Sequence, residues 1–311
     1  MALAAAACGA PAIEPLPPDS FAFGVFGDGP YFPWEQGQFR RVLDDVSRAD
    51  VEWLIHVGDI LWYPCSEAAY EDRLEQLNAL AHPVVYTPGD NEWTDCHESR
   101  AGGYEPLDRL AVLRKLFFAE PDRSLGGGAL ELASQAEDSA FAEFPENARW
   151  VRGGFVFATI HLVGSSNGLD DFSGRSAAHD AEVERRTRAA LAWLDEAFAL
   201  ARETGAKGVV LATHANVGLE GEPGARRGFE PFVERLEEHV ARFTGPVLLI
   251  HGDSHEQQVD QPLRDEGGRV YENFTRLETF GSPDIGWVRV VVDTVTGRIT
   301  RYEPRQMRGW W

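Results

Sequence analysis

The chain of 311 residues lacks two features that would place it in common classes of protein. No run approaches the roughly 20 consecutive apolar residues that a membrane-spanning helix needs. Basic residues are few, with 29 Lys and Arg against 50 Asp and Glu, so the formal net charge is -21. Because nucleic-acid surfaces need clustered Lys and Arg, this balance argues against a DNA- or RNA-binding protein. Bound cations would still allow an anionic chain to process a small phosphorylated substrate.

Residues 27–37 also lack a nucleotide-binding motif. Their sequence, GDGPYFPWEQG, has no Gly-Lys-Ser or Gly-Lys-Thr ending, which a phosphate-binding P-loop requires. Cysteine is scarce as well, with three in the chain. We expect Cys65 and Cys96 to lie on loops at one edge of a sheet, where an exported protein permits a disulfide. Two free thiols are the alternative.

The N-terminal stretch MALAAAACGAPAIEPLPPDS resembles the end of a bacterial export signal. Cys8 stands near the position of a lipoprotein cysteine, although Ala5 occupies the place where Leu is usual. We therefore expect residues 1–19 to be a leader or signal remnant. The protein would be exported, as a periplasmic, lipid-anchored or secreted protein, with Cys8 as the site of the anchor. A leader with no address is the alternative.

The chain does contain many short apolar runs, and hydrophobic residues make up 43% of it, enough for a large core. The runs predict strands at residues 21–26, 53–57, 83–86, 155–160, 208–212, 246–250, 287–293 and 298–303. Helical spacing at residues 38–48, and again through residues 191–201, falls between predicted strands. Alternating strands and helices predict an α/β layered fold. We expect residues 20–311 to form a single domain with an insertion around residues 100–150 that caps a sheet edge.

Polar residues follow five of the predicted strands. The segments that come next read GDGPYF, GDILWYPC, GDNEWTDC, HANVG and HGDSHEQQ. A single Gly-Asp at a strand end is ordinarily a turn. Five such exits point instead to the carboxyl edge of a sheet, where ligand sites form in α/β folds. Aspartates, an amide and histidines suit Mn, Fe, Zn or Mg.

These segments resemble the motifs of the calcineurin-like metallophosphoesterases, a family that includes the purple acid phosphatases. The matching stretches are GDGP, GDI, GDNE, THAN and GDSH, in the family's order. The resemblance covers almost everything after residue 20, and it is greatest to a bacterial exported branch that also carries GDNEWTDC and HGDSH. It implies a four-layer α/β/β/α sandwich of mixed sheets, with a metal site at the C-terminal ends of strands.

The resemblance also implies a set of metal ligands, carried over position by position. The expected ligands are Asp28, Asp59, Asp90 or Asn91, His214, Asp253 and His255. Asp28 and His255 would bind the first metal, His214 would bind the second, and Asp59 would bridge the two. Two metals that share a carboxylate stand roughly 3.5 to 4 Å apart, the separation that two-metal hydrolysis needs.

Two departures from the family pattern concern the first metal. Pro30 occupies the position of a family His, so this metal loses a nitrogen ligand. Tyr31 or Tyr63 would replace it, as a tyrosine does in purple acid phosphatases, although neither spacing fits well. Asp253 replaces the other His of the fifth motif. The site is therefore harder and more negative than usual, which favours Mn or Fe, with Mg, Ca or Zn as alternatives.

The third departure concerns the GDNE motif. Asp90 falls where the family has an Asn ligand and Asn91 where it has a catalytic His, although another alignment makes Asn91 the ligand. An amide donates a hydrogen bond but cannot deliver a proton. We therefore expect His161, and after it His251, to be the general acid. For His161, hydrogen bonding to a loop carbonyl is an equal alternative.

The resemblance implies hydrolysis of phosphate esters, with two bound cations that clamp the ester and activate a water to hydroxide. Arg276 is the first candidate for gripping the phosphate, followed by Asn91, Ser165 and Asn167. The substrate would be a small monoester or diester. The alternative is a catalytically weakened protein that binds metal and a phosphorylated ligand or a protein partner without turnover.

Overall fold

The computed structural model describes residues 13–221 and 226–307. Cys8 and most of the expected leader lie outside this part, so the lipid anchor stays a prediction. Among the described residues, no helix has the length and apolar character needed to cross a membrane.

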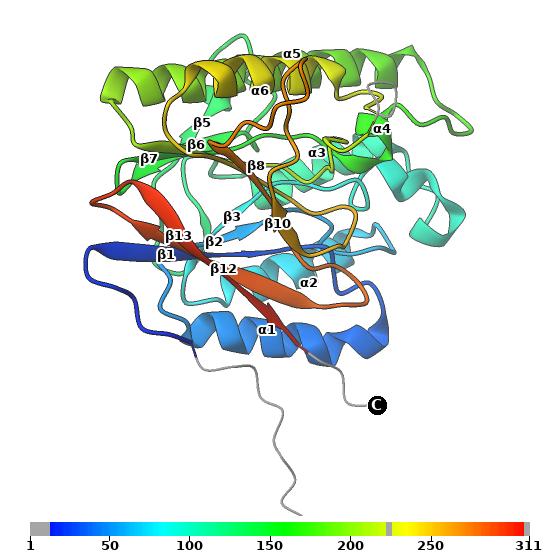
Figure 1. Ribbon diagram of the computed structural model, residues 1–311. Coiled ribbons are helices and arrows are strands. Elements are labelled where there is room, and N and C mark those ends of the chain that lie inside the picture. Colours follow the sequence, from blue (N-terminus) through cyan, green and yellow to red (C-terminus); the bar gives the residue numbers. More distant parts are fainter. Residues whose placement is uncertain (1–12, 222–225, 308–311) are drawn as a thin grey trace, which may run out of the picture.

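Two mixed sheets form the centre of the molecule (Figure 1). The first contains, in spatial order, β13 (Arg298–Gln306), β12 (Gly286–Asp293), β1 (Ser20–Phe26), β2 (Leu54–His56), β3 (Pro83–Tyr86) and β4 (Leu125–Gly126). The second contains β10 (Gln258–Asp260), β11 (Phe274–Glu278), β9 (Val247–His251), β8 (Gly208–Ala212), β7 (Phe155–Thr159), β6 (Ala148–Arg152) and β5 (Ala133–Ser134).

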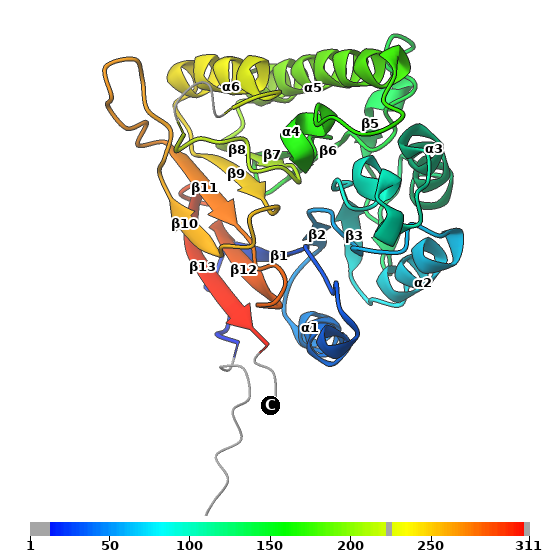
Figure 2. The ribbon, with the colours of Figure 1, turned by 90° about the vertical axis from the view of Figure 1, so that its right-hand side faces the viewer.

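Helices cover the outer face of each sheet (Figures 1 and 2). The first sheet is covered by α1 (Gln36–Arg48), α2 (Glu67–Asn78) and α3 (Pro106–Phe117). The second is covered by α5 (Ala177–Thr204) and α6 (Glu230–Arg242). Short turns complete the helical elements: η1 (Pro33–Glu35), η2 (Thr94–His97), η3 (Ser99–Ala101), η4 (Gln135–Glu137) and α4 (Gly164–Gly168). The predicted four-layer α/β/β/α sandwich is confirmed.

The two sheets pack face to face through an aromatic core. Phe23 of β1 stacks on Trp53 with ring centroids 5.6 Å apart, and Phe157 of β7 meets both rings edge-on. All three side chains are buried, so each contributes about 1.5–3 kcal/mol of hydrophobic stabilisation or more. The alternation of apolar residues in FAFGVF sends Phe21, Phe23 and Val25 into this central layer, whereas Ala22 and Phe26 face the helices.

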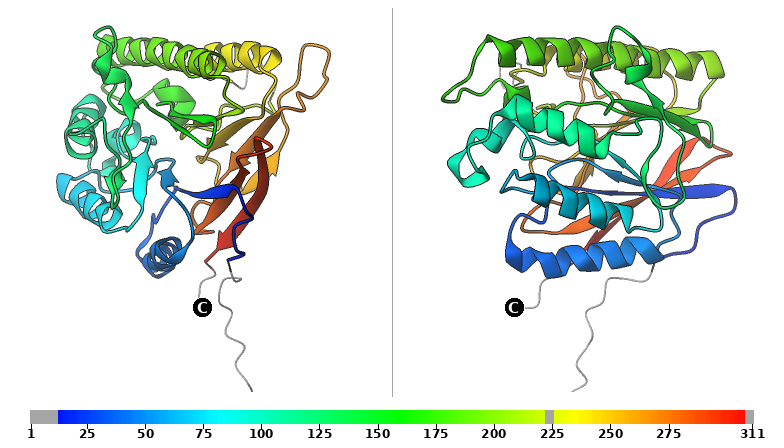
Figure 3. Two further views of the ribbon diagram at one scale, coloured as in Figure 1. Left: turned by 90° about the vertical axis from the view of Figure 1, so that its left-hand side faces the viewer. Right: turned by 180° about the vertical axis from the view of Figure 1, so that it is seen from behind.

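The eight predicted strands correspond to β1, β2, β3, β7, β8, β9, β12 and β13, and the two predicted helical segments to α1 and α5. Sequence reading missed β6 and β11, since Arg149 and Arg276 interrupt their apolar pattern. Residues 100–150 provide α3, the edge strands β4 and β5, and most of β6, which pairs with β5, so this segment extends both sheets (Figure 3).

Parallel pairing brings the polar strand exits together. β1, β2 and β3 run parallel in the first sheet, and β7, β8, β9 and β11 run parallel in the second. The carboxyl ends of neighbouring parallel strands meet at one edge of a sheet. In this sandwich the strand ends of the two sheets also meet each other, with His214 Nε2 3.4 Å from Asp59 Oδ1. Segments from five strands therefore converge on one site.

Candidate metal centre

Sharp left-handed turns place the candidate ligands directly after their strands. Asp28, Asp59, Asp253 and His255 have φ of 51°, 54°, 73° and 65°. This conformation is uncommon for residues other than glycine and costs on the order of 1 kcal/mol or more for each. Strained backbone of this kind clusters at functional sites, where the surrounding structure maintains it. The turns direct the side chains across the strand ends.

The first group of candidate ligands joins the two sheets. Asp28, Asp59 and His255 each offer an atom, and these atoms lie within 4.8 Å of one another. Tyr31 belongs with them, because its hydroxyl donates to Asp59 Oδ2 at 2.5 Å and lies 3.2 Å from His255 Nε2. Of the two tyrosines proposed for the missing nitrogen ligand, Tyr31 is thus in the centre, whereas the side chain of Tyr63 is 41% exposed and contacts Trp62.

The second group shares Asp59 with the first. Asp59, Asp90 and His214 again offer atoms within 4.8 Å of one another. His214 Nε2 lies 3.2 Å from Asp90 Oδ1 and 3.4 Å from Asp59 Oδ1. Its other nitrogen, Nδ1, donates to the backbone oxygen of Val57 at 2.9 Å. A hydrogen bond of this kind fixes the ring and leaves Nε2 directed at the carboxylates, as in metal-binding histidines.

Asp253 and Asn91 complete the centre. Asp253 Oδ1 lies 3.8 Å from His214 Nε2, and its backbone N–H donates to Asp28 Oδ1 at 3.0 Å. The Asn91 backbone N–H and its Nδ2 both donate to the Asp59 carboxylate, at 3.1 and 2.6 Å. Asp90 therefore offers a carboxylate to the second group, and Asn91 orients the shared aspartate.

The centre contains more acidic than basic side chains, which favours the binding of cations. Burial raises the pKa of Asp28 to about 8 and raises the pKa of Asp59 well above its usual range. Asp28 Oδ2 is buried with no hydrogen-bond partner. Four aspartates surround the imidazole of His214, and they raise its pKa although burial lowers it. A buried carboxylate oxygen without a donor is costly, and a bound cation would satisfy it.

Glu92, which sequence reasoning left without a role, anchors the turns beneath the centre. Its Oε1 accepts hydrogen bonds from Asp59 N at 3.0 Å, Gly89 N at 2.9 Å and the Tyr86 hydroxyl at 2.6 Å. The side chain is fully buried. It thereby joins the turn that carries Asp59 to the turn that carries Asp90. Its place as the last letter of GDNE was the signal for this role.

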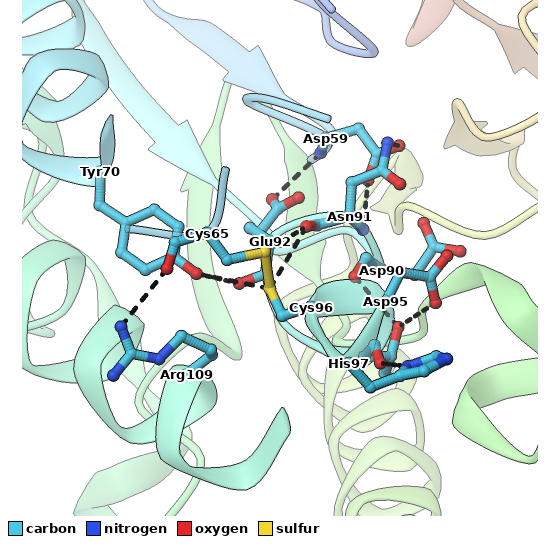
Figure 4. Close-up of a disulfide and its surroundings, with 11 residues drawn as sticks. Asp59, Cys65, Tyr70, Asp90, Asn91, Glu92, Asp95, Cys96, His97 and Arg109 are labelled. Carbon is cyan, nitrogen blue, oxygen red and sulfur yellow. Dashed lines mark hydrogen bonds between the residues drawn. A yellow bond between two sulfur atoms is a disulfide. The ribbon is translucent and has the colours of Figure 1, made fainter. Parts of the chain in front are cut away.

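A disulfide connects the same two turns (Figure 4). Cys65 and Cys96 are bonded, buried, and 5.7 Å apart at Cα, so the alternative of two free thiols is wrong. Each cysteine stands six positions after a candidate ligand, Asp59 or Asp90. Beside the bond, the Tyr70 hydroxyl donates to the backbone oxygen of Glu92 at 2.7 Å. The ligand-bearing loops after β2 and β3 are therefore fixed to each other covalently.

His161 lies in a separate buried network. Its Nδ1 is 2.7 Å from Glu146 Oε1, and Glu146 also makes two hydrogen bonds with Arg114. The ring packs edge-on against Trp93 with centroids 5.6 Å apart. Burial lowers the pKa of His161 in spite of the neighbouring carboxylate. A carboxylate, and not the loop carbonyl of the alternative interpretation, thus holds this ring, and its role as general acid stays a prediction.

The other proposed helpers also have protein partners. Arg276 on β11 makes ion pairs with Asp260 and Glu220, so phosphate binding would require these pairs to open. His251 Nδ1 lies 2.8 Å from Gly252 O, and burial lowers its pKa to about 4. The role proposed for Arg276 stays a prediction.

Ser165 and Asn167 lie on α4, a left-handed turn with φ of 52° and 58° at the two residues. Ser165 Oγ donates to Asp90 Oδ2 at 2.8 Å and so orients a candidate ligand. The Asn167 carbonyl oxygen accepts from the buried guanidinium of Arg186. Gly164 lets this turn approach closely, because a Cβ there would stand 2.4 Å from Asp90 Oδ2 and 2.6 Å from Asp253 Oδ1.

A cavity of about 490 Å³ gives access to the centre. It is lined by Tyr31, Phe32, Trp34, Glu35, Asp59, Trp62, Asp90, Asn91, Asp253, His255, Ser282 and Pro283. Ligand carboxylates form one part of the wall and aromatic rings another. Sequence reasoning missed Phe32, Trp34 and Trp62, although these aromatic residues follow closely after the GDG and GDI segments.

A family model matches most of the chain. It is described as calcineurin-like phosphoesterase and covers residues 32–257. A search of curated proteins found no match. Among solved structures, the chain is similar to TT1561 of Thermus thermophilus, with 11% identity, a TM-score of 0.45, and 93% of this chain and 99% of that chain covered. It is similar to a phosphatase from Mycoplasma pneumoniae, with 11% identity, a TM-score of 0.41, and 93% and 94% covered. It is also similar to a 5'-nucleotidase from Candida albicans, with 10% identity, a TM-score of 0.42, and 92% of this chain and 54% of that chain covered.

Proposed function

The chain belongs to the calcineurin-like phosphoesterase family and is a metallophosphoesterase, and from this premise we propose that it hydrolyses a small phosphate monoester or diester at a binuclear centre. One observation carries the proposal. Two groups of ligand atoms share Asp59 at the wall of an open cavity. When bound, two cations would offset the charge of the ester and lower the pKa of water enough for attack near neutral pH.

The protein residues would hold the centre and orient it. Asp28, His255 and the Tyr31 hydroxyl would face one cation, and Asp90 and His214 the other. The predominance of carboxylates favours hard cations, so we propose Mn or Fe, with Zn, Mg or Ca as alternatives. Asn91, whose amide donates to Asp59, keeps the shared carboxylate in place at the cavity wall.

Binding without turnover is a second candidate function, and a specific observation favours it. Asn91 stands at the cavity wall but has no proton to give to a leaving group, and His161 is held by Glu146. A protein of this kind would take up metal and a phosphorylated ligand and release the ligand unchanged.

Turnover separates the two candidates. Metal-stripped protein would be resupplied with Mn and assayed with bis-p-nitrophenyl phosphate and with p-nitrophenyl phosphate. We expect hydrolysis of at least one ester, lost in Asp59→Ala and retained in Asp44→Ala, which removes an exposed aspartate on α1. Uptake of metal with no hydrolysis of either ester would favour the binding function and contradict the hydrolase.

We also propose that the protein is exported. Support comes from the buried disulfide between Cys65 and Cys96, a bond that persists in oxidising compartments and is rare in reducing ones. Fractionation of cells that express the full chain would test this. Recovery with the reducing cytosolic fraction and with free thiols at both positions would contradict it.

A further inference from the structure

The cavity beside the metal centre has a continuous aromatic wall. Phe32 and Trp34 stack with ring centroids 4.4 Å apart and planes 7° apart. Trp62 meets Phe32 edge-on at 5.0 Å and also contacts Tyr31 at 5.9 Å. Because the Tyr31 hydroxyl donates to Asp59, these rings extend without interruption from the ligand groups to Trp34.

The wall is held rigidly from behind by Glu35. This side chain is 1% exposed, and its Oε2 accepts from the backbone N–H groups of Tyr31 and Phe32 at 2.8 and 3.2 Å. Its Oε1 accepts from the Ser282 hydroxyl at 2.6 Å. A buried carboxylate with three donors fixes the loop after β1 at Tyr31 and Phe32, so this part of the wall is positioned before any ligand arrives. Such preorganisation lowers the entropic cost of binding.

Trp34 nevertheless remains open to solvent. Its side chain is 67% exposed, although Phe32 covers one face of the indole. Single exposed aromatic residues are ordinary, but a stacked array inside a cavity with convergent polar groups is typical of ligand sites. Arg100 lies over the Trp62 ring at 4.4 Å and so packs against the middle of the wall.

We propose that Phe32, Trp34 and Trp62 form a stacking shelf for a planar aromatic group carried by the phosphate ester. This inference rests on the proposed function. The candidate ligand carboxylates and the shelf line one cavity. A phosphate held at these carboxylates by bound cations would therefore place the organic part of the ester against the shelf. The volume of about 490 Å³ lies in the range of small-molecule sites. Aryl phosphates and nucleoside monophosphates share this chemistry.

A pair of phosphonates tests the shelf without relying on turnover. Phenylphosphonate and methylphosphonate carry the same anionic head, differ by one ring, and have a carbon–phosphorus bond that ester hydrolysis does not cleave. By calorimetry on the Mn-loaded protein, we expect phenylphosphonate to bind roughly tenfold more tightly, the gain typical of one aromatic contact. Trp34→Ala should abolish the difference, Trp34→Phe should keep most of it, and Val295→Ala, equally exposed on a distant turn, should keep all of it.

Kinetics with three esters then identify the source of the ring. Adenosine 5'-monophosphate and ribose 5-phosphate share a leaving oxygen, so if the shelf binds a nucleobase, KM should be lower for the nucleotide, and Trp34→Ala should remove this difference with little change in kcat. If the shelf binds an aryl group, Trp34→Ala should raise KM for naphthyl phosphate alone. Equal binding of the two phosphonates would overturn the inference and leave the wall as a surface for a protein or lipid partner. If the parent bound phenylphosphonate more tightly than methylphosphonate but hydrolysed none of the esters, the proposed function would be contradicted and the shelf would stand.

Discussion

Removal of the Cys65–Cys96 bond should lower the free energy of unfolding substantially. The bond closes a loop with a sequence separation of 31. In the chain-entropy model, closing a loop of this length stabilises the folded state by about 3.7 kcal/mol at 25 °C. We therefore expect Cys65→Ala/Cys96→Ala to lose roughly that much free energy of unfolding. Since denaturant slopes for urea reach about 3 kcal/mol/M, the midpoint should fall by about 1 M.

The assay is urea unfolding followed by circular dichroism, with and without reductant. Reductant should lower the midpoint of the parent and leave that of the double variant unchanged. Cys8→Ser serves as the matched control, because it removes the third cysteine and keeps the bond. The stabilising role of the bond would be refuted if the parent, shown by thiol counting to be fully reduced, unfolded at the same urea concentration as the oxidised protein. Glu92 would then suffice to hold the two turns together.

Substitutions of Tyr31 in the centre and of Glu146 in the neighbouring buried network should have distinct effects. Tyr31→Phe should leave the fold intact but weaken metal retention, because it removes the donor to Asp59. Dialysis against a chelator would measure the loss of metal, and unchanged retention would contradict the placement of Tyr31 at the centre. Glu146→Gln should lower the free energy of unfolding by about 3 kcal/mol, because the partially buried Arg114 loses its ion-pair partner; a change below about 1 kcal/mol in urea unfolding would count against this. Burial opposes ionisation of Glu146, but Arg114 and His161 lower its pKa to about 2. The ionised side chain therefore stabilises the fold above the ordinary pKa of a glutamate, and this stabilisation should be lost as pH falls from about 4.5 towards 2. Acid titration of the parent and of Glu146→Gln would show the difference.

The positions of eight strands along the chain and the convergence of five strand exits could be predicted from the sequence. Strands such as PVVY at residues 83–86 are short, apolar and followed by Gly-Asp, so local pattern alone identifies them. β11 could not be found in this way, since Arg276 lies in its middle and is neutralised by Asp260 and Glu220 from other segments. Pairing between distant residues is not visible in a local pattern.

The same limit applies to the site. The sequence could be used to predict candidate ligands such as Asp28 and Asp59 at strand exits, because their positions depend on local turns. It left Tyr31 and Tyr63 undecided, because the choice depends on where the loop after β1 meets His255 from the other sheet. It overlooked Phe32, Trp34 and Trp62, whose stacking is a property of the folded cavity rather than of their spacing along the chain.

Metal stoichiometry shows directly whether two cations bind and share Asp59. Metal-stripped protein would be reloaded with Mn, passed through a desalting column and analysed for metal content per chain. We predict two equivalents in the parent and in Asp44→Ala, and one or none in Asp59→Ala. A single equivalent in the parent, retained in full by Asp59→Ala, would contradict the shared-ligand centre.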